Sequence, residues 1–145
     1  MKEVGFALRK INTEEFATIE QDIAEEKEVE IQLNISSGFG INEESKLIAC
    51  FLNLQFELDE APFMILKLNC EFEIEEVAWE KFVIKKANKI KFPKGFLQHL
   101  AVLTVGTARG ILHTKTENTP YNKYYLPTIN VVEMITGDEE FPLEK

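Results

Sequence analysis

The sequence predicts an α+β protein in which a four-stranded antiparallel sheet, a meander at its core, is packed by one long helix and a short C-terminal helix. Three observations support this prediction. Apolar and polar residues alternate in three runs between positions 28 and 74, which is typical of strands with one buried face. The connections between these runs are too short for the crossover that parallel strands require. One long stretch at helical spacing follows, and it is apolar on more than one face.

The first expected strand is Val4–Ile11, where apolar and polar residues alternate around Phe6 and Leu8. Residues 12–27 are acidic and weakly patterned, so we expect a loop with at most one short helical turn. The first strand should join the three central strands as the fourth member of their sheet.

The three central strands are expected at Val29–Ile35, Lys46–Leu58 and Phe63–Ile74, because every second residue in them is apolar. Between the first two lies a segment rich in turn-forming residues, Gly38–Glu44. Asp59–Pro62 makes a tight connection between the other two. One face of the resulting sheet is apolar, and the other is polar and acidic.

Residues 75–92 are compatible with two structures. The sequence EEVAWEKFVI is able to extend the preceding strand, but one set of apolar residues also approximates helical spacing: Trp79, Phe82, Val83, Ala87 and Ile90. Four lysines form a basic cluster in this acidic chain, which we interpret as a solvated face: Lys85, Lys86, Lys89 and Lys91.

The long helix is expected from Phe96 to Glu117, because Pro93 and Gly95 interrupt the regular structure before it. Its main stripe recurs at three- and four-residue spacing: Leu97, Leu100, Ala101, Thr104, Ala108, Ile111 and Leu112. Further apolar residues widen the stripe, so a second side of the helix needs another subunit or a client to cover it. We therefore expect a dimer or tetramer whose interface contains Val102, Leu103, Val105, Gly106 and Gly110.

The helix should end at Asn118–Pro120, followed by an aromatic, mobile loop at Tyr121–Tyr125. A short second helix is expected at Val131–Ile135. Residues 1–137 then form a single domain, and residues 138–145 form an acidic, frayed C-terminal tail.

The composition sets limits on the class of protein. A chain of 145 residues with 45% hydrophobic residues is long enough to bury a core. A formal charge of −9 argues against nucleic acid as a partner, because phosphate binding needs a basic surface. The N-terminal residues contain no apolar signal sequence, and no apolar run is long enough to span a membrane. With Cys50 and Cys70 inside apolar strands, we expect buried free thiols and a cytoplasmic location.

No motif for catalysis or metal binding is present. His99 and His113 lie fourteen residues apart on one expected helix, about 21 Å, which is too far to share a metal ion. The sequence has no nucleophile elbow, P-loop or dinucleotide-binding glycine motif. We therefore expect no cofactor and no enzymatic activity.

The order of the expected strands and helices resembles that of the SecB family of bacterial export chaperones over nearly the full length of the chain. FALRKINTEEF resembles the first strand of that family and its acidic turn, and TARGIL contains a match to an Ala-Arg pair in its long helix. YLPTINVVEM resembles the segment that leads into the last helix of the family, with Leu126, Pro127 and Asn130 at the matching positions. Val131 stands where the family has Phe, and residues 75–95 do not align.

This resemblance implies a SecB-like chaperone that holds unfolded client polypeptides in an apolar groove and delivers them to the Sec export machinery. Candidate groove residues are Phe39, Phe51, Trp79, Phe82, Tyr121, Tyr124 and Tyr125. Each of these also has the ordinary interpretation of a core or subunit-interface residue. In the family, an acidic sheet face docks on the SecA motor, which implies that role here for Glu57, Glu71 and Glu73.

Two other functions fit the same sequence. The first is a SecB-like chaperone dedicated to one client, such as an antitoxin. The second is an oligomeric scaffold or interaction module that holds no client.

Overall fold

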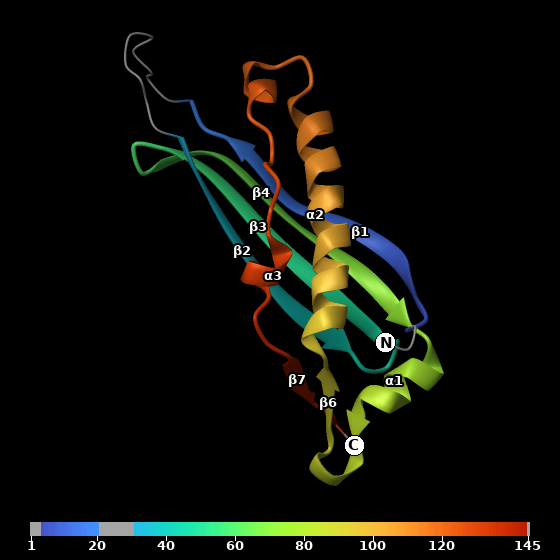
Figure 1. Ribbon diagram of the computed structural model, residues 1–145. Helices are drawn as coiled ribbons and strands as arrows, with labels where there is room; N and C mark the ends of the chain where they lie inside the picture. Colours follow the sequence, from blue (N-terminus) through green and yellow to red (C-terminus); the bar gives the residue numbers. More distant parts are fainter. Residues whose placement is uncertain (1–3, 21–30, 145) are drawn as a thin grey trace.

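The computed structural model describes residues 4–20 and 31–144. Its larger sheet contains β1 (Phe6–Thr18), β2 (Ile31–Asn42), β3 (Leu47–Leu58) and β4 (Ala61–Ile74). All neighbours are antiparallel and the spatial order is β1-β4-β3-β2 (Figure 1). The predicted meander is therefore confirmed, and the first strand joins it beside β4. The start of the second predicted strand, at Val29, lies outside the described residues.

The alternation in β3 and β4 corresponds to the two faces of the sheet. The buried apolar residues of one parity make the core: Ile48, Cys50, Leu52, Leu54, Phe56, Leu58, Met64, Leu66, Leu68, Cys70, Phe72 and Ile74. Helix α2 (Lys94–Thr116) lies across this face (Figure 1) and buries its main apolar stripe against it. The long helix predicted at 96–117 is confirmed.

β1 is longer than predicted, because the expected acidic loop is strand as far as Thr18. Phe16 is half-buried and pairs with Leu66 in the register between β1 and β4. Glu14 accepts a hydrogen bond of 2.6 Å from Asn69, and Glu15 lies 3.7 Å from the Lys67 ammonium. Partners on β4 thus hold a segment whose local sequence signal is weak. The rest of the predicted loop, residues 21–27, lies outside the described residues.

β2 also extends beyond its prediction, because Gly38–Asn42 is strand instead of turn. Gly38 pairs with Phe51 of β3, and Gly40 pairs with Ala49. A Cβ atom on Gly40 would lie 3.3 Å from the Phe51 ring, so this ring covers the space that the glycine leaves. The cross-strand contact overrides the local preference of glycine for turns.

The tight connection predicted at Asp59–Pro62 is confirmed as a two-residue hairpin turn. Asp59 and Glu60 both have positive φ angles, 49° and 66°. This backbone resembles the type I′ turn, whose twist matches that of the two strands it joins.

The ambiguous stretch 75–92 adopts a helix followed by a hairpin. Helix α1 (Glu76–Phe82) is followed by β5 (Val83–Ile84), the 3₁₀ turn η1 (Lys85–Ala87) and β6 (Lys89–Phe92). The helical alternative is therefore correct as far as Phe82, beyond which the chain folds back as a hairpin.

The end of the chain is more ordered than predicted. The expected aromatic loop contains a 3₁₀ helix, η2 (Pro120–Lys123), and the short helix α3 (Val131–Met134) is confirmed. A frayed tail is wrong for the residues of β7 (Glu139–Pro142), which pair with β6 and complete a second sheet of order β5-β6-β7. None of the helices within the described residues is long and apolar enough to span a membrane.

Candidate functional site

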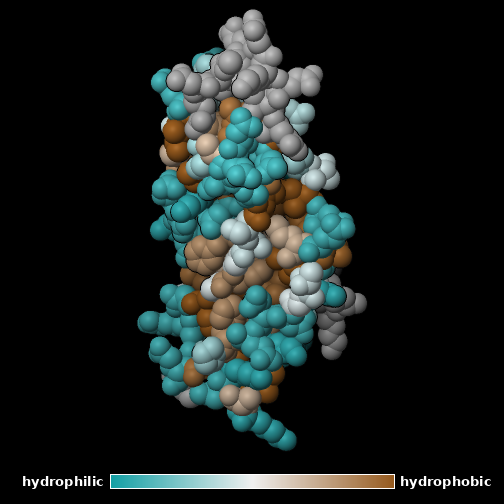
Figure 2. Space-filling view, turned by 90° about the vertical axis from the view of Figure 1, so that its left-hand side faces the viewer, coloured by the Kyte–Doolittle hydropathy of each residue, from teal (hydrophilic) through white to brown (hydrophobic). Residues whose placement is uncertain are grey.

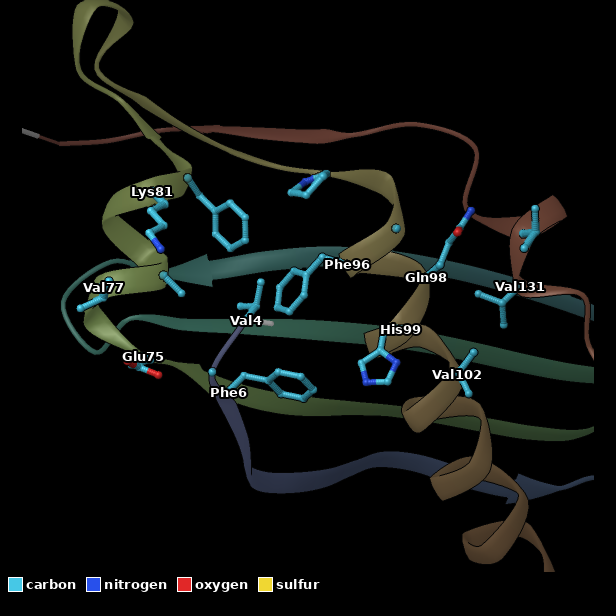
Figure 3. A pocket seen from close by; sticks show the side chains of 16 residues that line it. Val4, Phe6, Glu75, Val77, Lys81, Phe96, Gln98, His99, Val102 and Val131 are labelled. Carbon is cyan, nitrogen blue, oxygen red and sulfur yellow. The ribbon is translucent and has the colours of Figure 1, made fainter. Parts of the chain in front are cut away.

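A hollow lies at the end of the molecule where α1 meets the beginning of α2. The N-terminal residues 4–6, both of these helices and α3 contribute walls to it, and its volume is about 840 Å³. Figure 3 shows Val4, Phe6, Phe96 and His99 gathered between α1 and α2, with Val131 toward α3. Most of its lining is apolar, so the hollow is suited to an apolar guest.

Aromatic rings form the floor of this hollow. The Phe6 ring packs edge-on against Phe96 and His99, with centroid distances of 5.7 and 5.6 Å. Phe82 approaches Phe96 at 5.5 Å from the side of α1. Offset and edge-on pairs of this kind are favourable and fix ring positions, so three separate elements are locked around one surface.

Three valines from three different elements stand around the mouth of the hollow. Val77 of α1 is 59% exposed, Val102 of α2 is 53% exposed and Val132 of α3 is 64% exposed. Single exposed valines are ordinary, but three that converge on one apolar hollow form an exposed apolar surface. The polar side chains that line the same hollow are Glu75, Lys81, Gln98 and His99.

A second hollow of about 420 Å³ adjoins the first, because Val102 and Val131 line both. Its other walls come from Val105, Arg109 and the segment Tyr125–Ile129. We refer to the two adjoining hollows together as the apolar channel.

Arg109 gives the channel its second wall. Its guanidinium donates hydrogen bonds to the carbonyl oxygens of Leu126 (3.2 Å) and Pro127 (3.0 Å). The Asn130 side chain then accepts hydrogen bonds from the N–H groups of Val132 (3.1 Å) and Glu133 (3.4 Å), which begins α3. The positions that carry the family resemblance thus work together to hold this segment beside α2.

A further apolar surface lies on the side of the molecule that carries β2. Figure 2 shows hydrophobic side chains along the middle of this side, with hydrophilic residues around them. On β2, Leu33, Ile35, Phe39 and Ile41 are only partly buried against the core. β2 is an edge strand, and within the described residues no other strand pairs with its outer edge.

The predicted groove residues do not form one site. Phe82 and Tyr125 line the apolar channel, and Phe39 lies on β2. Tyr121 and Tyr124 pack on Phe63, with centroid distances of 6.4 and 4.9 Å. These two rings are therefore held against the sheet, and the expectation of a mobile loop is wrong for them.

Two of the predicted groove residues lie away from the channel. Trp79 is only 3% exposed and packs edge-on against Phe92, which places it in the core. Phe51 has the opposite parity to the core residues of β3, so it lies on the outer face of the sheet. Neither is available to a guest in the channel.

The predicted docking carboxylates are already bonded within the outer face of the sheet. Glu57 is buried and accepts hydrogen bonds from Asn34 and Gln55. Glu71 accepts from Asn12 (2.7 Å), and Glu73 forms an ion pair with Arg9 (2.9 Å). Their role toward another protein stays a prediction.

The predicted interface residues of α2 separate into two groups. Val102, Leu103, Gly106 and Gly110 are exposed along one side of the helix. Val105 is buried within the chain and lines the second hollow beside Val102 and Arg109, so it is not exposed on the side expected to meet another subunit. The open side contains only one permanent charge between Lys94 and Lys115, that of Arg109.

Cys50 and Cys70 are buried free thiols, as predicted, and they face each other across β3 and β4. Burial raises the pKa of the Cys50 thiol from its ordinary value of 9.0 to about 11, although a hydrogen bond with Thr104 partly opposes the shift. Burial also raises the pKa of Cys70. Both thiols therefore stay protonated at neutral pH, which makes them poor nucleophiles.

Sequence reasoning missed Val4, Phe6, Phe96 and the valine pair Val77 and Val132. Their spacing resembles that of core residues, and no local signal shows that the core ends beside them. Across the described parts of the chain, no group of three or more His, Cys, Asp or Glu side chains is placed to bind a metal ion.

No family model and no curated protein matches this sequence. A solved structure does match: the SecB-like chaperone Rv1957 of Mycobacterium tuberculosis, in complex with a peptide from the HigA1 antitoxin Rv1956. It is 6% identical, the match covers 86% of this chain and 90% of that one, and the TM-score is 0.56. The chain is similar in fold to a SecB-like chaperone.

A protein of unknown function from Streptococcus agalactiae is also similar, at 11% identity and a TM-score of 0.39, over 89% of this chain and 99% of that one. The first comparison confirms the predicted fold class, an α+β arrangement with a four-stranded antiparallel sheet, one long helix and short helices. In this chain the apolar channel lies beside the long helix α2.

Proposed function

We infer that this protein is a chaperone that holds unfolded polypeptides, with the apolar channel as the place where their apolar side chains are buried. The channel is the observation that carries this inference. It exposes Val77, Val102 and Val132 around an aromatic floor on a chain that otherwise has a charge of −9.

The physical driving force is the burial of apolar surface. Removing a Val- or Leu-sized side chain of a client from water contributes about 1.5–3 kcal/mol. Two adjoining hollows accept apolar side chains from more than one position of an extended client, and such contacts need no particular client sequence. The tight, sequence-tolerant binding that a holding chaperone requires follows from this arrangement.

Two roles are compatible with this holding activity, and they differ in where the bound client goes. In the first, the protein acts in the cytoplasm and delivers clients to the Sec machinery through SecA. In the second, it serves one dedicated client. Two observations favour the second version: Glu57, Glu71 and Glu73 are engaged within the sheet, and the similar chaperone was solved with an antitoxin peptide.

Suppression of the aggregation of an unfolded model protein tests the holding activity. We expect the wild-type protein to suppress aggregation at stoichiometric amounts. Val77→Asp, Val102→Asp and Val132→Asp should each raise the amount needed for half suppression by about tenfold, because a buried charge without a partner opposes binding. These side chains are exposed, so the substitutions should leave the fold intact.

Thr114→Asp is the matched control, since Thr114 is exposed on α2 and does not line the channel. A wild-type protein without any effect on aggregation would leave the scaffold alternative as the better account. Equal activity in the three valine variants and the wild type would show that the client binds outside the channel.

A further inference from the structure

The C-terminal strand β7 closes the second sheet by binding along one edge of β6. Lys91 pairs with Glu140 and Ile90 pairs with Phe141 in an antiparallel register. The register continues past the strand, where the Leu143 N–H donates to the Asn88 carbonyl oxygen (3.0 Å). The Asn88 side chain donates in turn to the Leu143 carbonyl oxygen (2.9 Å).

The contacts between this segment and β6 are of two kinds. Acidic side chains meet lysines: the Lys89 ammonium lies 3.1 Å from Glu140, and the Lys91 ammonium lies 3.6 Å from Asp138. The Phe141 ring packs edge-on against Phe92 at a centroid distance of 6.0 Å, and Leu143 is also partly buried against the core. The extended segment is thus held through charge and through apolar contacts, of which the aromatic one lies on β6.

The bound strand uses only part of the positive charge that this region offers. Residues 81–94 contain six lysines and no carboxylate. Of these lysines, only Lys89 and Lys91 form ion pairs among residues 4–20 and 31–144. Lys85 and Lys86 are exposed on η1, directly before Asn88.

We propose that the β6 edge, which β7 covers, is a docking site for an extended acidic segment of a partner protein that carries an aromatic residue at the position of Phe141. β7 occupies this site in cis and competes with the partner. The two proteins would associate by the addition of a strand to the sheet edge, a common mode of peptide recognition.

Two features favour exchange with a partner. The side chains in the ion pairs of β7 are partly or largely exposed to solvent, and pairs of this kind stabilise little. A longer acidic segment in the same register would pass Asn88 and reach Lys85 and Lys86, which β7 leaves unpaired. The partner therefore gains charge contacts that the cis strand lacks.

Binding of a fluorescent peptide with the sequence GDEEFPLE, residues 137–144, to the full-length protein tests the proposal. Phe141→Ala should weaken the cis strand, so this variant should bind the peptide about tenfold more tightly than the wild type. Addition of Lys89→Glu and Lys91→Glu to this variant should abolish binding. A scrambled peptide of the same composition should not bind.

A second peptide, GDEEFPLEEE, tests the unpaired lysines. It should bind the Phe141→Ala variant several-fold more tightly than the shorter peptide, and Lys85→Glu with Lys86→Glu should remove only this gain. Lys115→Glu with Lys123→Glu is the control of equal charge change elsewhere on the surface. Because Phe141→Ala removes an apolar contact as well, Asp138→Asn with Glu140→Gln provides a second way to loosen β7.

Three results would overturn the proposal. One is equal affinity of the wild type and both loosened variants for the peptide. Another is equal binding of the scrambled peptide. The third is a wild-type dimer, seen by light scattering, that Phe141→Ala converts to a monomer, since β7 would then be exchanged between two copies of this chain.

Discussion

At the scale of single residues, Arg109 links the long helix to the segment that follows it. Its two hydrogen bonds, to the Leu126 and Pro127 carbonyl oxygens, fix the Tyr125–Ile129 wall of the apolar channel. A planar guanidinium makes both bonds at once, which a lysine ammonium cannot reproduce with the same geometry.

We expect Arg109→Ala to lower the free energy of unfolding by about 1–3 kcal/mol, because two backbone carbonyl groups lose a charged donor. Arg109→Lys should recover only part of this loss. Urea unfolding measures both, with Lys115→Ala on the exposed side of α2 as a control. If Arg109→Ala unfolds at the same urea concentration as the wild type, the segment is held by other contacts.

Cys50 makes stability depend on pH in the alkaline range. Below pH 9 the thiol is protonated in both the folded and the unfolded chain. Between pH 9 and about 11 the unfolded chain loses this proton while the folded chain keeps it, because burial raises the pKa of Cys50 to about 11. The folded state then binds more protons, so the free energy of unfolding must fall as pH rises.

Cys50→Ala should therefore flatten the decrease of stability between pH 9 and pH 11. Chemical unfolding at several pH values gives the slope for each protein, and other titrating groups contribute equally to both. Identical slopes would show that the Cys50 thiol ionises as freely in the folded protein as in the unfolded chain.

At this scale the sequence predicts burial better than function. Period-two alternation placed Cys50 and Cys70 in the core correctly. It did not separate Val105, which is buried, from Leu103, which is 40% exposed, because both are apolar residues of one long helix. Only the direction in which α2 crosses the sheet decides between them.

At the scale of the elements, the two edges of the large sheet differ in kind. β1 carries four charged residues, and its register with β4 shifts twice. Both features protect an edge strand from pairing with other chains. β2 has no charged residue and no proline from Ile31 to Asn42, and its register with β3 is unbroken. Within the described residues no strand pairs with its outer edge, so the composition of β2 favours the addition of a strand there.

Ser36→Lys should weaken client holding, because a charge on the β2 edge opposes the addition of a strand. Ser36 is exposed, so the fold should tolerate the change. The matched variant is Thr13→Lys, at an exposed position of β1, which should keep full activity. Suppression of aggregation is the readout. Equal loss in the two variants would indicate an effect of charge alone.

The elements were predictable where the signal is local. Alternation found β3 and β4 to within a residue or two, and helical spacing found α2. β7 was missed because a short acidic segment forms a strand only through its pairing with β6, far away in the sequence. The glycines of β2 were misinterpreted as a turn because they pair with β3, which also supplies the ring that covers Gly40.

At the scale of the whole molecule, the exposed side of α2 presents apolar and small residues to solvent. Leu103 is exposed there, and Gly106 and Gly110 leave room for a close approach of another helix. We propose that copies of the chain pair through this side, as a dimer or tetramer.

Leu103→Glu should split this assembly and leave the fold intact, which light scattering and thermal unfolding measure together. Val105→Glu is the matched contrast. Val105 is only 5% exposed, so an unpaired carboxylate there should lower the thermal midpoint strongly. A monomeric wild type would refute the assembly proposal. An unchanged mass in Leu103→Glu would place the interface on another side.

The residues that line the channel could not be predicted from the sequence. Its walls come from residues 4–6, α1, α2 and α3, which lie far apart in the chain. The sequence indicates that each of these pieces is apolar, but the space between them depends on how α1 packs beside α2. The family resemblance predicted an apolar groove, but most of the residues that it suggested for this groove do not line the channel.

The strand order has a consequence for how the protein is made. β1 leaves the ribosome first, yet its neighbour β4 is complete only at Ile74, which pairs with Phe6. β2, β3 and β4 pair with their neighbours in sequence and are able to form hairpins during synthesis. β1 thus waits several seconds without a strand partner at the usual rate of about 5–20 residues per second. The charges that protect β1 in the finished sheet also protect the nascent strand, before any core exists to cover it.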